Sequence, residues 1–374
     1  MTTRVVQFGT SRFLQAHADL FIHEARERGQ DIGPITVVKT TAGTERAGRV
    51  QAFEAPQGFP VRIRGLDGGR EVDTLVQVRS VTRALDAHQD WARLRTVFAG
   101  ETELVISNTG EAGYALSPAD WQPPTGVPDG FPAKLLYLLR YRYGHGAAPL
   151  LILPCELVSE NGKVLRAALT DLATAWGEGA DFLAWLRGSV AICDTLVDRI
   201  VSQALEPIGA VAEPYALWAI QTEPGMVPPF QHPCVTYTGD LTPFLRLKLH
   251  ILNLGHSWLA QLWLTGERQA DETVRQILSD AAVREGLLRL YRDEVIPGFA
   301  ARGMGAEAAA YVAQTLERFQ NPFLDHRLSD IAQYHAAKIE RRVAAFLIWV
   351  KELSPDLPLS TLEDLAQSGA PARD

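Results

Sequence analysis

The chain has 374 residues, of which 47% are hydrophobic and 21% charged, and its formal net charge is −8 at pH 7. This length exceeds one ordinary domain, so we expect two domains with sizeable cores. The charge pattern shows no basic stripe able to neutralise phosphates, which argues against a nucleic-acid partner. Three widely spaced cysteines with no CxxC pair argue against a disulfide framework and against a zinc site; they are Cys155, Cys193 and Cys234.

The N-terminus enters a strand-like run at once, Arg4 to Phe8, which leaves no room for a signal peptide. No apolar stretch approaches the roughly 18–20 residues that span a bilayer. We therefore expect a protein of the reducing cytoplasm that has no membrane partner and is a monomer or a small homo-oligomer.

The first part of the chain alternates short apolar runs with amphipathic segments, which predicts βαβ units around a mostly parallel sheet. Asp67-Gly68-Gly69 separates two strand-like runs and predicts an inserted β-hairpin. The expected strands are 4–8, 35–38, 59–66, 71–83, 103–107 and 150–153, and the expected helices are 12–28, 89–98 and 132–143.

From about residue 243 the pattern becomes almost continuously helical. The fold class is therefore predicted to be an α/β Rossmann-type N-terminal domain followed by a mostly α-helical C-terminal domain. We place the boundary near Asp240, with a dinucleotide-binding domain at 1–240 and a substrate and catalytic domain at 241–374. The last segment, 354–374, is rich in Pro, Ser and Ala and is expected to be weakly ordered.

The first predicted strand ends at Gly9, and a helix starts within a few residues. A helix N-terminus offers unpaired N–H groups to a pyrophosphate. Of the usual GxGxxG fingerprint this chain keeps only the first glycine, so a plain strand–loop–helix connection is the alternative. The candidate cofactor residues of this turn are Gly9, Ser11, Arg12 and Phe13.

In an open α/β sheet, ligands bind at the carboxyl ends of the strands, where this chain places Thr40, Asn108, Thr109 and Glu111. We expect these residues to contact the ribose or amide of a nicotinamide cofactor. The second strand ends without the acidic residue that usually binds the ribose of NAD. NAD is expected, and NADP is not excluded; the candidate phosphate partners are Lys39, Arg46 and Arg49.

One predicted helix carries Lys248, Asn253 and His256 within an arc of roughly 140°. His250 falls outside that arc and is expected to face solvent or an interface. Three polar residues on one face are often a solvated face. The neighbouring residues are almost all apolar, however, and a helix that is apolar nearly all round is buried.

This trio suits hydride transfer at a secondary alcohol. A lysine whose pKa is lowered by burial or a nearby cation can exchange the hydroxyl proton. Asparagine and histidine donors can stabilise the oxygen as it gains negative charge. We therefore predict Lys248 as the general acid/base, assisted by Asn253 and His256, with no metal.

The chain resembles the mannitol dehydrogenase family, the long-chain polyol dehydrogenases, through several blocks that occur in the family's order. Within the family it is most similar to the tagaturonate reductase (altronate oxidoreductase) branch. The blocks are Val5–Gly9 with Arg12–Leu14, Ile106–Thr109 with Glu111–Gly113, Pro154–Leu157 with Asn161-Gly162, Leu196–Ile200, Tyr215–Gln221, Asp240–Pro243, the Lys248, Asn253 and His256 helix, and Asn321-Pro322 with His326.

The resemblance implies a metal-independent, NAD(P)-dependent oxidoreductase acting on a polyol or a sugar acid, with lysine as the acid/base. It also implies that Asp198 lies near the site, with Glu156 as a further substrate-binding candidate. The mannitol branch has Asp-Asn where this chain has Glu156-Leu157, so that asparagine is not carried over. Arg199 could bind a substrate carboxylate or could pair with Asp198 or Glu156.

The substrate expected from these features is a keto-uronate or ketose, with the tagaturonate and altronate pair first. A sugar phosphate such as mannitol 1-phosphate is the alternative that keeps the chemistry. A non-catalytic nucleotide-binding sensor or scaffold is the alternative of another class. Lys338 and Arg341, three residues apart on the last long helix, fit a solvated face better than an anion site.

Overall fold

The computed structural model describes residues 4–43, 47–110 and 113–368. It divides into two compact units. The first unit comprises residues 1–63, 74–212 and 216–241, and the second comprises 64–73, 213–215 and 242–374. A parallel-sheet unit followed by a helical unit confirms the predicted fold class.

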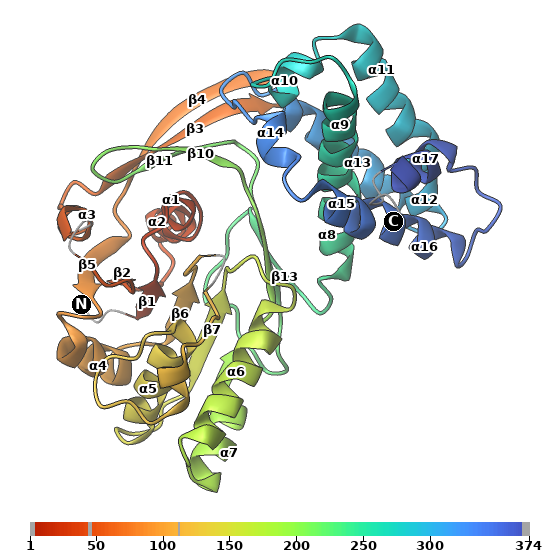
Figure 1. Ribbon diagram of the computed structural model, residues 1–374. Helices are drawn as coiled ribbons and strands as arrows, with labels where there is room; N and C mark the ends of the chain where they lie inside the picture. Colours follow the sequence, from red (N-terminus) through yellow and green to blue (C-terminus); the bar gives the residue numbers. More distant parts are fainter. Residues whose placement is uncertain (1–3, 44–46, 111–112, 369–374) are drawn as a thin grey trace. The chain divides into compact units, whose positions relative to one another are not determined.

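The first unit is built on a six-stranded sheet in the order β5-β2-β1-β6-β7-β8 (Figure 1). All of its strand pairs are parallel. Phe8 is level with Val38 and Ser107, and Ser107 is level with Pro154, so four neighbouring strands end at one edge. The strands are β1 (Val5–Phe8), β2 (Ile35–Lys39), β5 (Val81–Asp86), β6 (Leu104–Ser107), β7 (Leu150–Pro154) and β8 (Val190–Ile192).

Helices cover both faces of this sheet, as Figure 1 shows for α1 and α2 on one side and α4 and α5 on the other. Alternate residues of β1 supply the two cores: Val5 packs with one set of apolar side chains, and Val6 and Phe8 with the other. The helices are α1 (Arg12–Leu14), α2 (Leu20–Glu27), α3 (Ala47–Ala52), α4 (Trp91–Gly100), α5 (Phe131–Tyr143), α6 (Asn161–Ala175) and α7 (Ala180–Ser189), with a short 3₁₀ turn at Pro118–Trp121.

The predicted hairpin is present, but its second strand is shorter than expected. Gly68 and Gly69 turn the chain with positive φ values. The run expected over 71–83 breaks at Ser80, whose hydroxyl donates to the Asp19 carbonyl and whose own carbonyl accepts from Ile35. The residues after the break therefore enter the main sheet as β5, and the hairpin consists of β3 (Phe59–Asp67) and β4 (Arg70–Val78).

Two smaller sheets complete the strands, with the orders β10-β11-β3-β4 and β13-β12-β9. Asp198 is the last residue of β9, in the second of these sheets. The remaining strands are β9 (Thr195–Asp198), β10 (Val201–Ala204), β11 (Ala210–Ala212), β12 (Leu217–Gln221) and β13 (Val235–Thr238).

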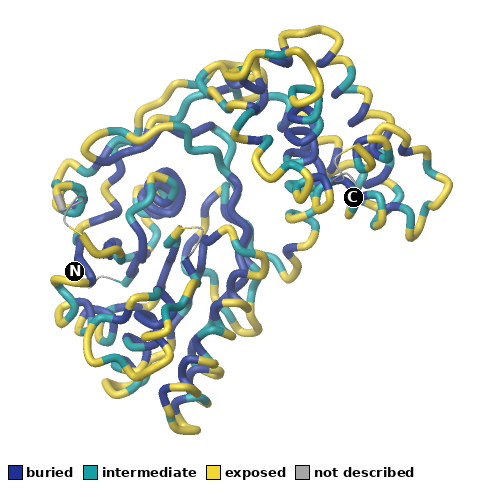
Figure 2. The backbone as a smooth tube through the Cα atoms, viewed as in Figure 1, coloured by how far each residue is buried: buried dark blue, intermediate teal, exposed yellow. Residues whose placement is uncertain are grey.

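The second unit is helical around a core of its own, visible as dark blue tube in Figure 2. Part of the segment expected to be weakly ordered is a helix: α17 places Leu362 and Leu365 in that core, three residues apart on one face, whereas residues 369–374 lie outside the described residues. The helices are α8 (Thr242–Leu247), α9 (Asn253–Thr265), α10 (Val274–Ile277), α11 (Ala281–Arg289), α12 (Ile296–Ala300), α13 (Gly305–Phe319), α14 (Leu328–Ile331), α15 (His335–Ile339), α16 (Ala345–Lys351) and α17 (Ser360–Ser368).

In the described residues, four π-turns interrupt the helices, and each joins two α-helical stretches into one continuous helix. A π-turn carries i→i+5 hydrogen bonds and is rare outside functional regions. One lies in the first unit, between α1 and α2, and three lie in the second. They are η1 (Gln15–Asp19), η3 (Lys248–Leu252), η4 (Leu290–Val295) and η5 (Glu340–Ala344).

Within the described residues, none of the helices combines the length and the apolar character needed to cross a bilayer. The same residues contain no group of three or more His, Cys, Asp or Glu side chains arranged to hold a metal ion.

Candidate active site

The turn after β1 depends on Gly9. Its φ is +115°, a conformation that favours glycine, and a Cβ there would collide with the Asn108 carbonyl oxygen. The Gly9 amide donates to the Val38 carbonyl at 3.0 Å. The absence of a side chain therefore lets the ends of β1, β2 and β6 approach one another closely.

Ser11 caps the helix that follows. Its hydroxyl oxygen accepts from the Leu14 amide at 3.2 Å, and the hydroxyl donates to the side-chain oxygen of Asn108 at 3.1 Å. The Asn108 amide group in turn donates to the Cys155 carbonyl at 2.7 Å. Ser11 and Asn108, both predicted cofactor residues, thus connect the loops after β1, β6 and β7.

Arg12 and Phe13 form the first turn of the helix. Arg12 is exposed, and Phe13 is half-buried with its ring stacked on His17 at 4.7 Å between centroids. The guanidinium of Arg12 is therefore available to a ligand at the helix N-terminus, whereas Phe13 anchors the turn.

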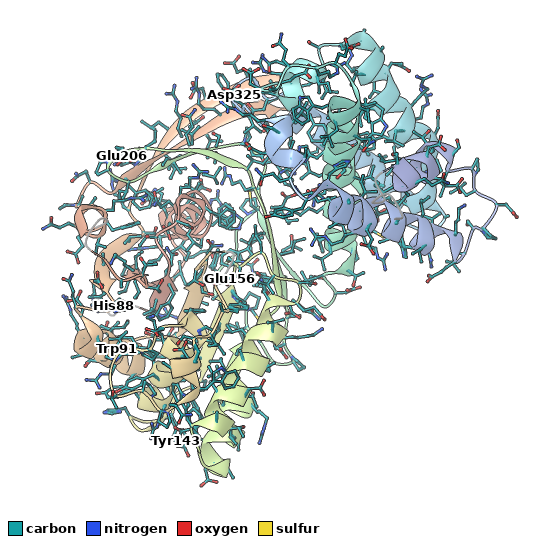
Figure 3. All side chains as sticks on the ribbon, viewed as in Figure 1. His88, Trp91, Tyr143, Glu156, Glu206 and Asp325 are labelled. Carbon is teal, nitrogen blue, oxygen red and sulfur yellow. The ribbon has the colours of Figure 1, made fainter. Side chains whose placement is uncertain are left out.

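A cavity of about 300 Å³ opens beside the ends of the strands. Thr40 and Thr109, both predicted from their positions after β2 and β6, contribute to its wall, as does His88, which is labelled in Figure 3. Glu111 lies outside the described residues. The complete lining is Thr40, Thr41, Ala42, His88, Thr109, Gly113, Ala115, Asp129, Gly130, Phe131 and Lys134.

Lys39 does not fill the role of phosphate partner considered for it. The side chain is buried, and Nζ donates to the Asp86 carboxylate at 2.8 Å and to the carbonyls of Thr41 and Gly43 at 2.7 and 2.9 Å. An ammonium group has three N–H donors, so all of them are used. Arg49 is half-buried in α3, and Arg46 lies outside the described residues.

These features fit a dinucleotide. A capped helix N-terminus, a glycine whose Cβ position is already filled by a neighbouring carbonyl, and a cavity at the strand ends are the features that binding a pyrophosphate and an adenosine would require.

Glu156 follows β7 and is labelled in Figure 3. The side chain is buried, and its carboxylate accepts from the Ser107 hydroxyl at 2.9 Å, from the amide and hydroxyl of Thr109 at 3.1 Å each, and from the Tyr114 hydroxyl at 3.2 Å. Burial raises the pKa of Glu156, and these hydrogen bonds oppose the rise. Glu156 therefore holds the loop that carries Thr109.

Asp198 and Arg199 lie at the end of β9. Asp198 is buried, and Arg199 is half-buried and donates to the Ala16 carbonyl at 2.6 Å. Ala16 belongs to the π-turn η1, so this predicted substrate residue supports the helix that starts at Ser11. Cys155 is fully buried, and burial raises its thiol pKa well above the usual value, so it packs in the core and is not a reactive thiolate.

In the second unit, the π-turn changes how Lys248, Asn253 and His256 are aligned. Lys248 opens the turn, and the Asn253 amide donates to the Lys248 carbonyl five residues back. In a regular α-helix, residues five apart are rotated by about 140°, and a wider turn reduces this rotation. His256 follows Asn253 with α-helical spacing. The three side chains therefore share a narrower face than the sequence indicates.

Lys248 and Asn253 are half-buried, whereas His256 is buried. The His256 ring lies 4.5 Å from the Phe319 ring and 4.8 Å from the His326 ring, between centroids. Burial lowers the pKa of His256 well below its usual value, and the charges of His326, Arg342, Arg318 and Lys338 lower it further. His256 is therefore a neutral imidazole at physiological pH.

His250 is not a solvent residue, contrary to expectation. It is buried, its Nδ1 lies 2.9 Å from the Arg342 carbonyl, and its ring stacks on Trp349. His250 still points away from the trio, and it is buried because η5 and α16 pack on that side of the helix.

The neighbourhood of His256 is cationic. Lys338 is half-buried and donates to the Ile331 carbonyl, and burial and the charges of Arg342 and Arg341 lower its pKa. Arg318 forms a buried ion pair with Glu213 at 2.8 Å. Within the described part of the chain, Lys338 and Arg342 form no ion pair with a carboxylate. This region therefore has an excess of positive charge.

Sequence reasoning missed the role of Arg342 and Tyr291, which contact the π-turn, and treated Lys338 as part of a solvated face. No sequence signal set Arg342 apart, because it lies beside Glu340 and Arg341 in a charged stretch of its helix. No sequence signal marks the π-turn itself.

Two family models cover most of the chain. The mannitol dehydrogenase Rossmann domain matches residues 3–228, and the mannitol dehydrogenase C-terminal domain matches residues 240–359. The chain belongs to the mannitol dehydrogenase family. This membership confirms the resemblance and the expected class, an oxidoreductase that uses a nicotinamide cofactor on a CH–OH group.

Family members of known name include altronate oxidoreductases. That of Halalkalibacterium halodurans is 31% identical over 369 residues, covering 91% of this chain and 69% of its own. That of Bacillus subtilis is 27% identical, covering 95% of this chain and 76% of its own.

Among solved structures, a substrate-free D-sorbitol dehydrogenase has a TM-score of 0.80 at 17% identity and covers 99% of this chain and 80% of its own. A Pseudomonas fluorescens mannitol 2-dehydrogenase, solved with NAD and D-mannitol, has a TM-score of 0.71 at 17% identity, with 99% and 79% covered. At these identities the likeness establishes the fold.

Proposed function

We propose that this protein interconverts a keto-uronate and its hydroxy acid by NAD-linked hydride transfer, with tagaturonate and altronate as the first pair to test. Residues 1–240 would bind the dinucleotide, and residues 241–374 would carry the catalytic groups. The altronate oxidoreductases at 27–31% identity support this choice of substrate.

The observation that carries the proposal is the excess of positive charge around His256. A neutral polyol carries no charge that this positive charge could stabilise. The carboxylate of a sugar acid does, and a favourable interaction with these cations would bind it. Lys338 and Arg342 are both at least partly withdrawn from water, so their charges are screened less than those of surface residues.

The chain's own groups account for the proton. In reduction, Lys248 as an ammonium donates a proton to the substrate oxygen as negative charge develops there. In oxidation, Lys248 as a free amine accepts the hydroxyl proton. The bound nicotinamide supplies or accepts the hydride. Asn253 through its amide group, and His256 through the single N–H of its neutral ring, donate hydrogen bonds to the same oxygen.

On the cofactor side, we assign Gly9, Ser11 and Arg12 to the pyrophosphate, and Thr40, Asn108 and Thr109 to the ribose and amide groups. Glu156 would act through the Thr109 loop that it holds. NAD is favoured over NADP because the donors of Lys39 are already used. A reducing cytoplasm suits the three free thiols.

The same cationic region would accept a phosphate, so a sugar-phosphate dehydrogenase is the second candidate. A non-catalytic nucleotide-binding protein is the candidate of another class, but it gives no reason to gather Lys248, Asn253 and His256 on one face.

The test is the loss of reduced-nicotinamide absorbance with NADH or NADPH against tagaturonate, fructuronate, fructose and fructose 6-phosphate. Turnover of a uronate alone supports the proposal. Turnover of fructose 6-phosphate alone selects the sugar-phosphate reaction, and turnover of fructose alone contradicts an anionic substrate. Tight NADH binding with no turnover of any of the four supports the non-catalytic candidate.

A further inference from the structure

We propose that Arg342 and Tyr291 are positioning residues that hold the π-turn Lys248–Leu252 in its wide form, and thereby set the placement of Lys248 relative to Asn253 and His256. This inference rests on the proposed function, because it takes Lys248 to be the acid/base. Every contact that supports it lies within the helical unit.

The π-turn has a cost that the surrounding groups must offset. Its i→i+5 hydrogen bonds replace those of a regular α-helix, and such turns survive only as single interruptions. If η3 reverted to α-helix, the rotation between Lys248 and Asn253 would return to about 140°. The position of Lys248 therefore depends on whatever stabilises the turn.

Arg342 contacts the turn and the start of α9 from a neighbouring helix. Its Nη1 donates to the Asn253 carbonyl at 3.2 Å and to the Ser257 hydroxyl at 2.9 Å. Its own backbone carbonyl lies 2.9 Å from His250 Nδ1, inside the turn. Arg342 thus forms hydrogen bonds with residues on both sides of Leu252, the last residue of the π-turn.

Tyr291 contacts the same turn from a third helix. Its ring is buried, and its hydroxyl donates to the Ile251 carbonyl at 3.0 Å. The hydroxyl reaches that carbonyl over Gly255, where a Cβ would collide with it. The glycine next to His256 is therefore explained by the approach of Tyr291.

Both donors are themselves in π-turns, Tyr291 in η4 and Arg342 in η5, and both turns contact η3. A buried hydroxyl is expensive to leave unpaired, and so, to a lesser degree, is a half-buried guanidinium. Burial and the charge of Arg341 lower the pKa of Arg342 to about 10. The Ile251 carbonyl in the π-turn and the Asn253 carbonyl directly after it accept from these donors, so the turn and the donors stabilise one another.

The decisive variant is Tyr291→Phe, because it removes one hydroxyl and no charge. Arg342→Gln removes the guanidinium, and Arg342→Lys restores the cation as the conservative rescue. Arg268→Gln is the matched control, since Arg268 is a half-buried arginine of the same unit that pairs with Glu272 and Asp280 away from the π-turn.

The first readout is kcat, KM and the pH profile of kcat on the substrate that the enzyme turns over. We expect kcat to fall about tenfold in Arg342→Gln and severalfold in Tyr291→Phe, since small misplacements of reacting groups are costly. We expect the pH profile to shift in both and the NADH Kd to stay unchanged. Arg342→Lys should recover part of kcat.

The second readout needs no substrate: competitive acetylation of amines across pH, with peptide mass spectrometry, measures the pKa of Lys248 directly. A shifted Lys248 pKa in Tyr291→Phe, with none in Arg268→Gln, supports the inference. Lower thermal stability with unchanged kcat, pH profile and Lys248 pKa in Tyr291→Phe would overturn it. Retained turnover in Lys248→Ala would refute the proposed function alone, since the labelling result stands apart from it.

Discussion

The ammonium of Lys39 lies 2.8 Å from the carboxylate of Asp86, and the two side chains are only 3% and 11% exposed. This ion pair occupies the end of β2, where a Rossmann-type domain meets the ribose of its cofactor. Lys39, which the sequence analysis considered as a partner for the extra phosphate of NADP, thus stabilises the fold and has no donor left for a ligand.

We therefore predict that NADPH binds at least about tenfold more weakly than NADH, a difference of about 1.4 kcal/mol. Fluorescence titration with both reduced cofactors measures the ratio. In Asp86→Asn the freed ammonium should bring the Kd for NADPH closer to the Kd for NADH. The protein should also lose roughly 3–5 kcal/mol of stability, because a buried charge loses its partner. Equal affinities in the unaltered protein would contradict this role of the pair.

Lys248→Met tests the acid/base role with a side chain of similar length. We expect kcat to fall by about 10²–10⁴, the usual contribution of a positioned acid or base. The Kd for NADH should stay within about twofold, since the residues proposed to bind the dinucleotide are in the other unit. Lys351→Met, which removes a lysine of the same unit that is paired with Glu363, is the control. Appreciable turnover in Lys248→Met would exclude this lysine as the acid/base.

Most of the fold was predictable because its signals are local. The runs that became β1, β2, β6 and β7 are short, apolar and bounded by turn residues, and the hairpin turn carries its two glycines. The trio of Lys248, Asn253 and His256 stands out because polar residues interrupt an apolar helix. These inferences need no knowledge of which segments meet in space.

The errors have a different origin. The helical period placed His250 away from the trio but could not show that η5 and α16 pack on that side and bury it. The final helix was hidden because the Pro, Ser and Ala around it outweighed the spacing of Leu362 and Leu365. Contacts between distant residues were also missed. Lys39 pairs with Asp86, 47 residues away, and Glu156 with Ser107, 49 residues away. Arg342 donates to Asn253, 89 residues away, and no local pattern spans such separations.

The buried histidines predict how stability depends on pH. Burial lowers the pKa of His250 to about 4 and that of His256 well below its usual value. The unfolded chain binds these protons near pH 6.5 and the folded chain does not, so stability rises with pH across this window and is lost on acidification. His250 alone should account for roughly 3 kcal/mol between pH 7 and pH 4.

Urea unfolding at a series of pH values measures this slope. In His250→Gln, which keeps a donor for the Arg342 carbonyl but does not titrate, the slope between pH 7 and pH 4 should become shallower. His145→Gln is the control, because that histidine is exposed. An unchanged slope in His250→Gln would mean that folding leaves the pKa of His250 close to its value in the unfolded chain, which would contradict this prediction.

Asp19 makes the stability of the protein depend on pH in the opposite direction. It is fully buried in π-turn η1, and burial raises its pKa well above the usual value. Here the folded chain holds the proton that the unfolded chain releases near pH 4, so this group's contribution falls as pH increases above that point. Asp19→Asn removes the titration while keeping the shape.

We therefore expect Asp19→Asn to be more stable than the unaltered protein at pH 8, with the gain shrinking towards pH 4, in urea unfolding of both proteins. Asp31→Asn, which changes an exposed aspartate of the same unit paired with Arg4, should show no such trend. If Asp19→Asn were less stable at pH 8 as well, Asp19 would have to be an ionised carboxylate whose charge is matched within the fold. The donors that stabilise the charged carboxylate would then be expected close to Ser80, whose hydroxyl donates to the Asp19 backbone carbonyl.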